Sequence, residues 1–323
     1  MPGWQMAEVT AISSAHMPAN NEMIPMYTPQ KTTDSSIIER VKQIDSWWNP
    51  YVIEGEPNIL TKEWFREWHP WRLDVDKAVI DAAIGADKSG RTLLDIACND
   101  GWYSFKAREA GFDVTGVEIR PEVVERAKLL QSYFGHDNIE FLEGDVQEDG
   151  TVQGPYDVSL FYGILYHLRD PIGALERVGQ LTNRLICVQT FIHALDGRPT
   201  LYLKREDPFE EGNSITRLIT TPTQRAVVIM LREAGFDHVY RALPKNYIAG
   251  RINSTAAWQW SFFYGVKGDP LPDLPGVVKL EDSDSPRNSF GFASRLYRRA
   301  EWIARRLVGK DAGSDRFAKS IKH

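Results

Sequence analysis

Short apolar runs alternate with amphipathic stretches through the middle of the chain. The apolar runs have the length of buried strands and cover residues 92–96, 113–117, 139–142, 156–162 and 185–188. The stretches around them place apolar side chains on one face, as surface helices do, at residues 71–86, 103–109, 121–135 and 171–181. Strands that alternate with helices predict a mostly parallel sheet covered by helices on both faces, which is a doubly wound α/β fold.

Two more strands are expected further along, at residues 239–243 and 258–266, and they bring the predicted sheet to seven strands. A helix before them is predicted to begin where Thr221 and Pro222 read as an N-cap followed by proline, and to end at Gly235. Residues 192–220 are long and polar for a single connection. We therefore expect either a functional loop or a partly structured insertion there.

The predicted core spans residues 71–268. The region before it, residues 1–70, has a different pattern of hydrophobic and polar residues. Residues 1–34 lack hydrophobic periodicity and are predicted to be disordered. Residues 35–70 are predicted to form a helical, aromatic cap, since half of the ten tryptophans lie between Trp47 and Trp71. The cap is interpreted either as a layer packed on the core or as a lid with an aromatic wall over the substrate.

The net charge of −6 is distributed unevenly along the chain. Residues 269–323 are predicted to be a linker and a basic amphipathic tail, with a helix at 294–309. From Pro286 to His323 there are ten Lys or Arg and three Asp or Glu, which gives +7 and leaves −6 − 7 = −13 for the rest. An acidic body disfavours a broad phosphate-binding surface, so nucleic acid is not the expected partner. The tail is expected to dock on the acidic body or on a partner subunit, or alternatively to attach to an anionic membrane surface.

Composition and spacing exclude several classes of protein. No apolar run is long enough to cross a membrane, and no basic region followed by an apolar core marks a secretory signal. Cys98 and Cys187 both fall in predicted core segments, which suits a reducing compartment and predicts no disulfide. No compact cluster of His or carboxylate residues indicates a metal site. The predicted location is cytoplasmic, with contact to a membrane surface through the tail as the alternative.

A small-residue loop follows the first strand, at Ala97 to Gly101, and leads into a helix. Small side chains let a ligand approach the backbone, and the helix start offers free N–H groups, so this segment suits a nucleoside-bearing ligand. Asp95 ends the strand before it. The glycine-rich dinucleotide fingerprint would have Gly at 97 and 99, where this chain has Ala97 and Asn99.

Acidic residues also end the next two strands. Glu118 closes the second strand, where an acid can bind both hydroxyls of a ribose, and Asp145 closes the third, where it can accept from an exocyclic amine. Glu118 has an alternative interpretation as an acid paired with Arg120. The residues predicted to bind the nucleoside-bearing cofactor are Asp95, Ala97, Asn99, Gly101, Glu118, Asp145, Val146 and Tyr162.

This succession of acids after strands, over about residues 71–268, resembles the class I S-adenosylmethionine (SAM) methyltransferases. The resemblance implies a Rossmann-like fold that ends in antiparallel strands, SAM as cofactor and S-adenosylhomocysteine (SAH) as product. It also implies that Asp95 lies near the methionine amine of SAM or orients the loop. The other interpretation of Asp95 is a carboxylate that caps the following turn.

The segment from Tyr162 to His167 lies where these enzymes bring the methyl donor and the substrate together. His167 is the candidate general base, because imidazole can take a hydroxyl proton near neutral pH, and its alternative is a structural histidine. Tyr166 is a candidate for orienting cofactor or substrate. Three weaker pocket candidates are Gln189, His193 and Arg251.

Residues 163–171 resemble the tRNA wobble-uridine carboxymethyltransferase branch of the class. That branch implies a carboxylated SAM, whose extra carboxylate is held by a Lys ahead of the core, a Tyr and an Arg. Tyr166 matches the Tyr, but residues 47–57 contain no Lys. We therefore predict O-methylation of a hydroxyl on a small molecule or glycan, with a tRNA-modifying carboxymethyltransferase as the first alternative. A non-catalytic adaptor with the SAM fold is the second, because the loop at 97–99 is altered.

Overall fold

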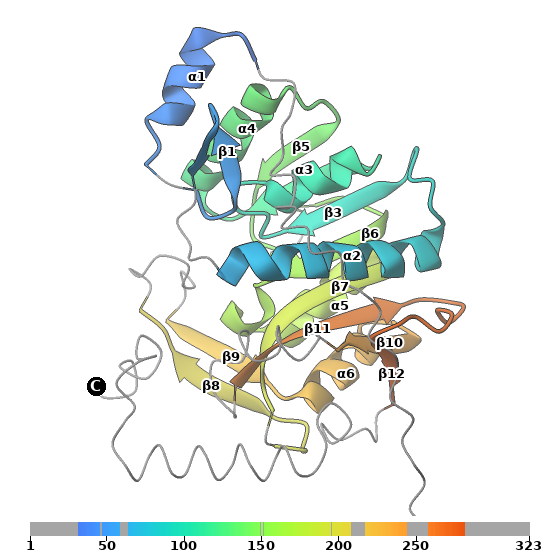
Figure 1. Ribbon diagram of the computed structural model, residues 1–323. Coiled ribbons are helices and arrows are strands. Elements are labelled where there is room, and N and C mark those ends of the chain that lie inside the picture. The colour runs from blue at the N-terminus through green and yellow to red at the C-terminus, as the bar shows by residue number, and fades with distance from the viewer. Residues whose placement is uncertain are drawn as a thin grey trace, which may run out of the picture.

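The computed structural model describes residues 32–45, 47–58, 64–148, 150, 152–194, 196–207, 217–243 and 258–281 (Figure 1). Its centre is an eight-stranded sheet with the strand order β12-β10-β11-β7-β6-β3-β4-β5. Five strands are parallel, namely β3 (Thr92–Ile96), β4 (Asp113–Glu118), β5 (Ile139–Glu143), β6 (Tyr156–Tyr162) and β7 (Thr182–His193). The antiparallel strands are β10 (His238–Ala242), β11 (Trp258–Val266) and β12 (Val277–Leu280).

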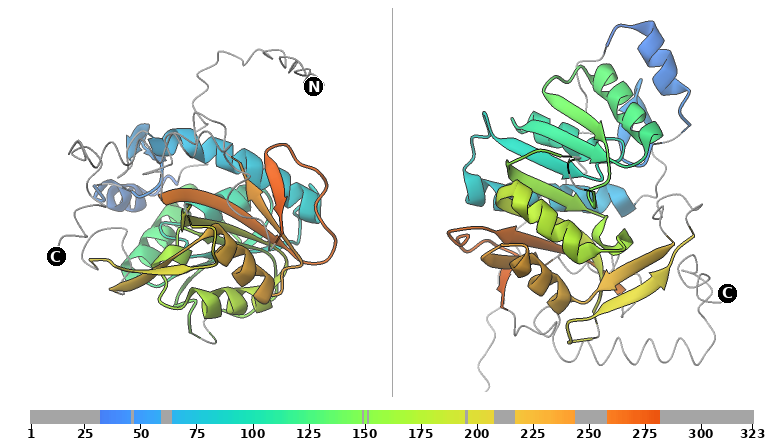
Figure 2. Two further views of the ribbon diagram at one scale, coloured as in Figure 1. Left: turned by 90° about the horizontal axis from the view of Figure 1, so that it is seen from below. Right: turned by 180° about the vertical axis from the view of Figure 1, so that it is seen from behind.

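Helices cover both faces of this sheet, as the alternating pattern predicts. One face carries α2 (Trp64–Ile84), α3 (Trp102–Glu109) and α4 (Pro121–Phe134), and the other carries α5 (Pro171–Leu181) and α6 (Gln224–Glu233) (Figure 2). Leu93 and Leu94 are both buried yet belong to opposite core layers, because successive strand side chains point to opposite faces. The predicted doubly wound α/β fold is confirmed.

Two details of the prediction were wrong. The sheet has eight strands, not seven, because β12 pairs with β10 beyond the predicted domain end at residue 268. The helix expected to be capped by Thr221 is capped by Thr223, whose Oγ1 accepts a hydrogen bond from Ala226 N. Thr221 and Pro222 belong instead to strand β9 (Leu218–Pro222), so the Thr-Pro pair closes a strand two residues before the helix begins.

The cap is a mixture of helix and strand, not helix alone. It contains α1 (Ser35–Lys42) and a small hairpin of β1 (Tyr51–Ile53) and β2 (Glu56–Asn58), and α2 already begins at Trp64. Trp47 and Tyr51 are buried with their rings 5.8 Å apart edge to face, and Tyr51 also lies 5.7 Å from the Phe134 ring of α4. This part of the cap therefore packs on the core.

The long polar connection after β7 contains a hairpin, which we call the arm: β8 (Leu201–Arg205) and β9. Its described part is thus a structured insertion. In Figure 1 the arm lies at the lower edge of the molecule, beside the end of β7. The predicted disordered segment 1–34 (except its last three residues), the loop with Arg251 and the basic tail helix lie outside the described residues. Among the described helices, none has the length and apolar character needed to span a membrane.

Candidate active site

A pocket of about 240 Å³ opens at the carboxyl ends of the parallel strands, next to the point where the chain order reverses between β3 and β6. This is where open α/β sheets bind their ligands. Nine of the ten residues predicted for the site line it: Asp95, Ala97, Asn99, Glu118, Asp145, Val146, Tyr162, Tyr166 and His167. The residues selected from the sequence therefore lie around one pocket in the structure.

Gly101 is the predicted site residue that does not line the pocket. Its backbone is left-handed (φ +84°), and a Cβ at this position would stand 2.7 Å from Phe141 Cζ and 3.2 Å from Phe105 Cε2. Glycine is required here because the backbone presses against aromatic side chains of the core. Gly101 was predicted to bring the backbone close to the ligand; the close approach in the structure is to aromatic side chains of the core.

The loop after β3 keeps its shape without the glycines of the fingerprint. Ala97 and Asn99 have left-handed backbones, with φ of +55° and +53°. Cys98 N donates to Val117 O at 3.0 Å and Asn99 N donates to Glu118 Oε2 at 3.2 Å, so the loop is bonded to the end of β4. The altered residues at 97 and 99 thus still fold into a loop against the strand.

Asp100 was missed by the sequence analysis, and it joins the cap to this loop. Its buried carboxylate accepts hydrogen bonds from Trp48 N at 3.0 Å, Asn49 N at 3.3 Å and Asn49 Nδ2 at 2.6 Å. Tyr51 OH donates to the Asp100 carbonyl at 2.9 Å. Burial raises the pKa of Asp100, and the hydrogen bonds from Asn49 and Trp48 oppose that rise. These bonds hold the cap against the pocket, where Trp48 and Asn49 form part of the lining.

Asp95 and Glu118 are both buried, with 2% of each residue exposed. Asp95 Oδ2 accepts from Ser104 Oγ at 2.7 Å, and burial raises the pKa of Asp95 to about 7 in spite of that bond. Glu118 Oε1 accepts from Arg120 Nε at 2.8 Å, so the expected pairing with Arg120 is present, although Glu118 is buried and is not a surface acid. Asn99 N, Arg120 N and Arg120 Nη2 also donate to this carboxylate, so a ligand hydroxyl would have to share its oxygens with these donors or displace one of them.

Asp145 caps its own turn, where its Oδ1 accepts from Gln147 N at 2.8 Å. The turn follows β5 and carries Val146, whose side chain is 9% exposed, into the pocket lining. The chemistry of the two residues, one acceptor beside an apolar contact, suits the amine edge and the flat face of a base.

Arg72 is a second residue that the sequence analysis missed. The guanidinium is 1% exposed and lies 4.1 Å from the centre of the Tyr103 ring and 3.5 Å from the centre of the Tyr162 ring. Arg72 Nε donates to Asp76 Oδ2 at 3.3 Å, and Arg72 Nη1 donates to Gln189 Oε1. Arg72 comes from α2, which precedes the first strand of the large sheet, and no local motif marks it.

One nitrogen of the Arg72 guanidinium lacks a hydrogen-bond partner among the described residues. Within the described part of the chain, Arg72 Nη2 has no hydrogen-bond partner although it is buried, while Arg72 lines the pocket. Buried guanidinium groups without full partners are rare and are satisfied well by carboxylates. The residues present therefore fit a ligand that combines a ribose, an amine-bearing base and an amino-acid carboxylate.

His167 and Tyr166 lie on a single 3₁₀ turn, η1 (Leu165–His167), on the other side of the pocket. His167 Nδ1 is 2.7 Å from Glu206 Oε2, a residue that follows β8 of the arm. The Tyr166 ring packs edge to face on Phe191 at 5.4 Å and on Trp260 at 5.3 Å between ring centres. An imidazole bonded to a carboxylate beside an aromatic wall is suited to proton transfer next to a flat or apolar group.

The weaker candidates have different outcomes. Gln189 lines the pocket, whereas His193 is not among the lining residues, and its ring lies tilted against Tyr202 with 4.5 Å between ring centres. Arg251 lies outside the described residues. Among the residues that the structure describes, no group of three or more His, Cys, Asp or Glu is placed to hold a metal ion.

Comparison with known proteins identifies the family. A family model described as a methyltransferase domain matches residues 64–240, which is more than half of the chain and includes nearly all of the pocket. The chain belongs to the methyltransferase-domain family. It is a class I SAM-dependent methyltransferase, and the match does not favour the adaptor alternative.

Sequence relatives of this methyltransferase are distant. A tRNA U34 carboxymethyltransferase of Syntrophotalea carbinolica is 27% identical over 239 residues, which cover 73% of this chain and 67% of that protein. A ubiquinone biosynthesis O-methyltransferase of Bordetella avium is 27% identical over 149 residues, 44% of this chain and 54% of that protein. The matches to these two relatives thus span between about half and two thirds of their length.

Solved structures agree on the fold. The N-terminal domain of EvdMO1 with SAH bound has a TM-score of 0.59 and 21% identity, and the match covers 74% of this chain and 98% of that domain. The same domain in the presence of SAH and D-fucose has a TM-score of 0.59 and 22% identity over the same shares of the two chains. At this identity the likeness supports the Rossmann-like methyltransferase fold.

Proposed function

We propose that this methyltransferase transfers a methyl group to a hydroxyl of a small molecule or glycan, with His167 as the general base. The observation that carries the proposal is the imidazole of His167, which lines the pocket and is hydrogen-bonded to a carboxylate. A hydroxyl is a poor nucleophile until it loses its proton, so a positioned base accelerates its methylation. An acceptor that is already nucleophilic would have no need of such a pair.

The cofactor residues are proposed from the same pocket. Glu118 binds the ribose hydroxyls, Asp145 accepts from the adenine amine beside Val146, and Asp95 binds the methionine amine. Arg72 donates its remaining N–H groups to the methionine carboxylate. SAM, when bound, supplies a methyl group on a sulfonium, which is already activated for displacement. The protein then has to align the acceptor in line with that methyl group and exclude water.

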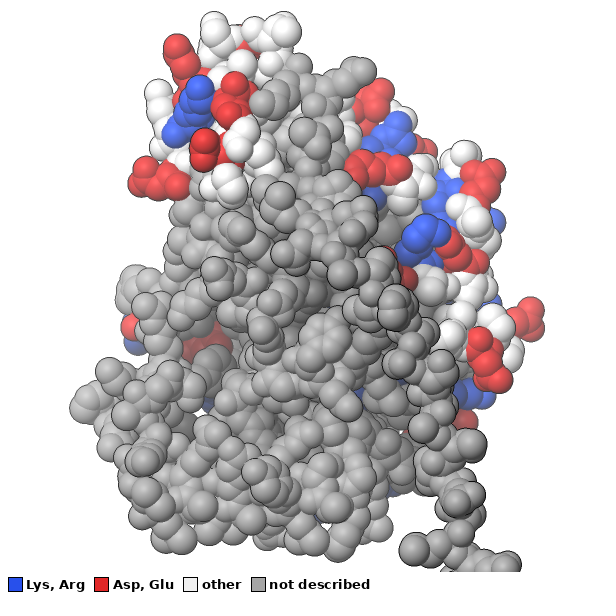
Figure 3. All heavy atoms as spheres, in the orientation of Figure 1, with Lys and Arg blue, Asp and Glu red and all other residues white. Residues whose placement is uncertain are grey.

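The acceptor side supports a hydroxyl on a ring. Tyr166, Phe191 and Trp260 form an aromatic wall, which suits a phenol or the apolar face of a sugar. The named relatives and neighbours include an O-methyltransferase and a domain crystallised in the presence of D-fucose. On the face in Figure 3, the described Lys and Arg side chains lie among Asp and Glu and form no separate basic patch.

Carboxymethyl transfer to a tRNA uridine is the second candidate, and one specific observation favours it. Arg72 Nη2 is a buried cationic donor without a partner in the described structure, on a residue that lines the pocket, and a methyl donor with a second carboxylate would need such a partner. Tyr166 matches the branch motif, and several relatives are named tRNA U34 carboxymethyltransferases. Against it stands the charge of −13 that the chain carries outside residues 286–323, the sum −6 − 7.

A matrix of donors and acceptors tests the two candidates. The full-length protein is incubated with either SAM or carboxy-SAM and with one of three acceptors: catechol, a deoxyhexose glycoside such as methyl D-fucoside, or unmodified tRNA. Mass spectrometry of each product is compared with that of the His167→Ala variant. We expect a one-methyl mass increase on catechol or the glycoside with SAM, and loss of that product in the variant. Carboxymethylated tRNA, formed with carboxy-SAM alone, would overturn the proposal in favour of the second candidate.

A further inference from the structure

His167, the candidate base, is hydrogen-bonded to Glu206, a residue of the arm. We propose that Glu206 is a positioning residue that fixes the tautomer and the orientation of His167. The inference rests on the proposed function for its catalytic consequence, since it is hydroxyl methylation that needs the base. Its structural part, the fixed tautomer, stands on the contacts of the two side chains.

The His167–Glu206 contact has the properties of a strong orienting bond. Nδ1 and Oε2 are 2.7 Å apart, and the two side chains are only 11% and 4% exposed. Little water competes for either group, so the hydrogen bond is stronger than it would be on the surface. An ionised carboxylate can only accept, so Nδ1 of neutral His167 must carry the proton. The lone pair then lies on Nε2, which is the nitrogen left to receive a proton from the acceptor.

The other ring in contact with His167 cannot replace Glu206 in this role. The centres of the Tyr166 and His167 rings are 4.0 Å apart, so Tyr166 and Glu206 are the titratable groups with direct contacts to the imidazole in the described structure. Burial raises the pKa of Tyr166, and the charge of Glu206 adds to that rise. The phenol therefore stays protonated at neutral pH, and Glu206 carries the negative charge that faces the imidazole.

The arm holds Glu206 in place at its near end. Glu206 N donates to Arg217 O at 3.1 Å, which continues the pairing of β8 with β9 by one residue. Thr220 Oγ1, on β9, donates to Leu168 O at 3.2 Å, directly after η1. Both strands of the arm therefore bond to the segment that carries the base, one through Glu206 and the other through Thr220.

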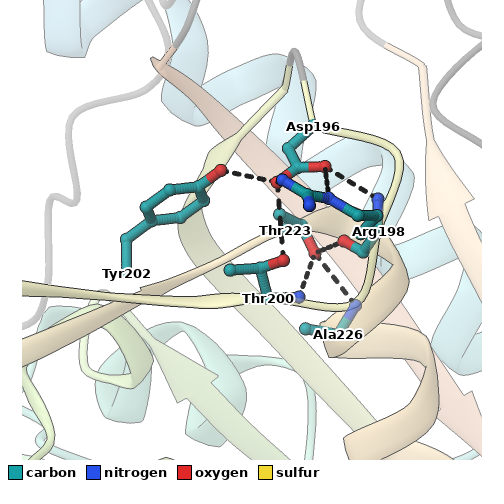
Figure 4. Close-up of polar contacts among 6 residues, drawn as sticks. All are labelled: Asp196, Arg198, Thr200, Tyr202, Thr223 and Ala226. Carbon is teal, nitrogen blue, oxygen red and sulfur yellow. Dashed lines mark hydrogen bonds and ion pairs between the residues drawn. The ribbon is translucent and has the colours of Figure 1, made fainter.

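The far end of the arm is fixed by a polar corner (Figure 4). The Asp196 carboxylate accepts from Arg198 N at 3.0 Å, from Arg198 Nε at 3.1 Å and from Tyr202 OH at 2.7 Å. Thr223 Oγ1 donates to Arg198 O at 2.7 Å and accepts from Thr200 N at 3.1 Å, while it also caps α6. With both ends attached, the arm presents Glu206 from a rigid strand end, as a base with a defined orientation requires.

The test reads the tautomer directly and needs no acceptor. Full-length protein is labelled with ¹⁵N-histidine and saturated with SAH, and the His167 ring signals are assigned by their loss in His167→Asn. We expect the Nδ1–H tautomer of neutral His167 in the unmodified protein. In Glu206→Gln the new amide can donate as well as accept, so we expect the Nε2–H tautomer to become populated. An unchanged Nδ1–H tautomer in Glu206→Gln would overturn the proposal.

Two controls separate positioning from folding. Asp207→Asn removes the neighbouring carboxylate, which is exposed, and should leave the His167 ring signals unchanged. SAH affinity in Glu206→Gln should stay within about twofold of the unmodified protein, because Glu206 is not among the residues that line the pocket. If Glu206→Gln fails to fold, Glu206→Asp, which shortens the side chain and keeps the charge, serves for the same comparison: a weakened tautomer preference supports the proposal, and an unaltered one opposes it.

Activity forms the second readout, with catechol or methyl D-fucoside as acceptor. In Glu206→Gln we expect kcat to fall by about 10-fold to 100-fold, less than the ~10²–10⁴ of a whole general base, with the KM for SAM unchanged. Glu206→Asp, which keeps the charge, should restore part of kcat. A changed tautomer with unchanged kcat would leave the positioning intact and would overturn His167 as the base, so the two failures are distinguishable.

Discussion

The two sides of the pocket are built in different ways. The cofactor side is made of short loops that follow β3, β4 and β5, and each of its acids lies within a few residues of the strand that positions it. The acceptor side is assembled from η1, the arm and β11, which are far apart in the chain: His167 and Glu206 are separated by 39 residues. On the cofactor side each acidic residue is positioned by the adjacent strand. On the acceptor side the residues are brought together by tertiary contacts between distant segments.

Because of this difference, substitutions on the acceptor side need not affect cofactor binding. The cofactor loops are bonded to the sheet and to each other, as in the contact between Asn99 N and Glu118. The acceptor side relies on an insertion that sits outside the parallel core, so its residues can be exchanged while the sheet stays intact. Substitutions on the two sides should therefore affect different measurements, binding on one side and transfer on the other.

The largest effect is expected from His167→Ala. Loss of a general base reduces the rate of transfer by about 10²–10⁴-fold, measured as kcat on catechol or methyl D-fucoside. SAH affinity, measured by calorimetry, should stay within about twofold, since His167 belongs to the acceptor side. If His167→Ala lost SAH affinity as well as kcat, the two sides of the pocket would be coupled and the distinction between them would be wrong.

Glu118→Ala should have the opposite profile. It removes the carboxylate that we propose to accept two hydrogen bonds from the ribose, worth about 1.5–3 kcal/mol each, so SAH affinity should fall by about 100-fold or more. Glu122→Ala, an exposed acid on the next helix, is the matched control and should leave SAH affinity unchanged. Equal affinities in the two variants would exclude Glu118 from cofactor binding.

Asp95 gives a pH dependence with a defined sign. Its pKa is raised by burial from 3.8 to about 7, so the carboxylate that binds a cationic amine forms only as the pH rises. SAH affinity should increase by about tenfold between pH 6 and pH 7.5, following the ionised fraction. The folded state holds a proton that the unfolded chain releases, so this group lowers the stability as pH rises from about 4 to 7. Asp95→Asn should remove both trends, and trends that persist in this variant would point to another group.

The smallest effect concerns stability alone. Gly101→Ala adds a Cβ 2.7 Å from Phe141 to a left-handed backbone, so we expect a loss of about 2–3 kcal/mol in the free energy of unfolding by urea. Gly163→Ala is the matched control: its φ is also positive, at +71°, but no atom lies within 4 Å of the added Cβ. This control should lose only about 1 kcal/mol, the cost of the left-handed conformation. Equal losses would show that the contact with Phe141 relaxes freely.

Hydrophobic patterning was sufficient to predict seven of the eight strands, because strands such as β3, β4 and β6 are short apolar runs buried on both faces. The eighth strand was missed because β12 is only four residues long, and two of its residues are only partly buried. Thr221 and Thr223 could both start a helix, and which of them does so depends on the pairing of β9 with β8. Local signals thus set the elements, while their ends are decided by neighbouring strands.

The site could be predicted where a residue type and a strand end coincide, as for Glu118 and Asp145. Arg72, Asp100 and Glu206 were missed for one shared reason. Each gains its meaning from a partner in another element: Arg72 from the rings of Tyr103 and Tyr162, Asp100 from the cap, and Glu206 from His167. A single sequence without contacts presents them as ordinary charged residues.

The loop at Ala97 and Asn99 has a left-handed backbone at two residues that adopt it less readily than glycine. Left-handed backbone at a non-glycine residue costs about 1 kcal/mol in the folded state, but a chain without glycine also has fewer conformations to lose. The loop proposed to face the adenosyl group is also hydrogen-bonded to the end of β4, so little of the binding energy should be spent on ordering it. We therefore expect the cofactor loop to have nearly the same conformation with and without SAM. Conformational changes on binding should be confined to the acceptor side.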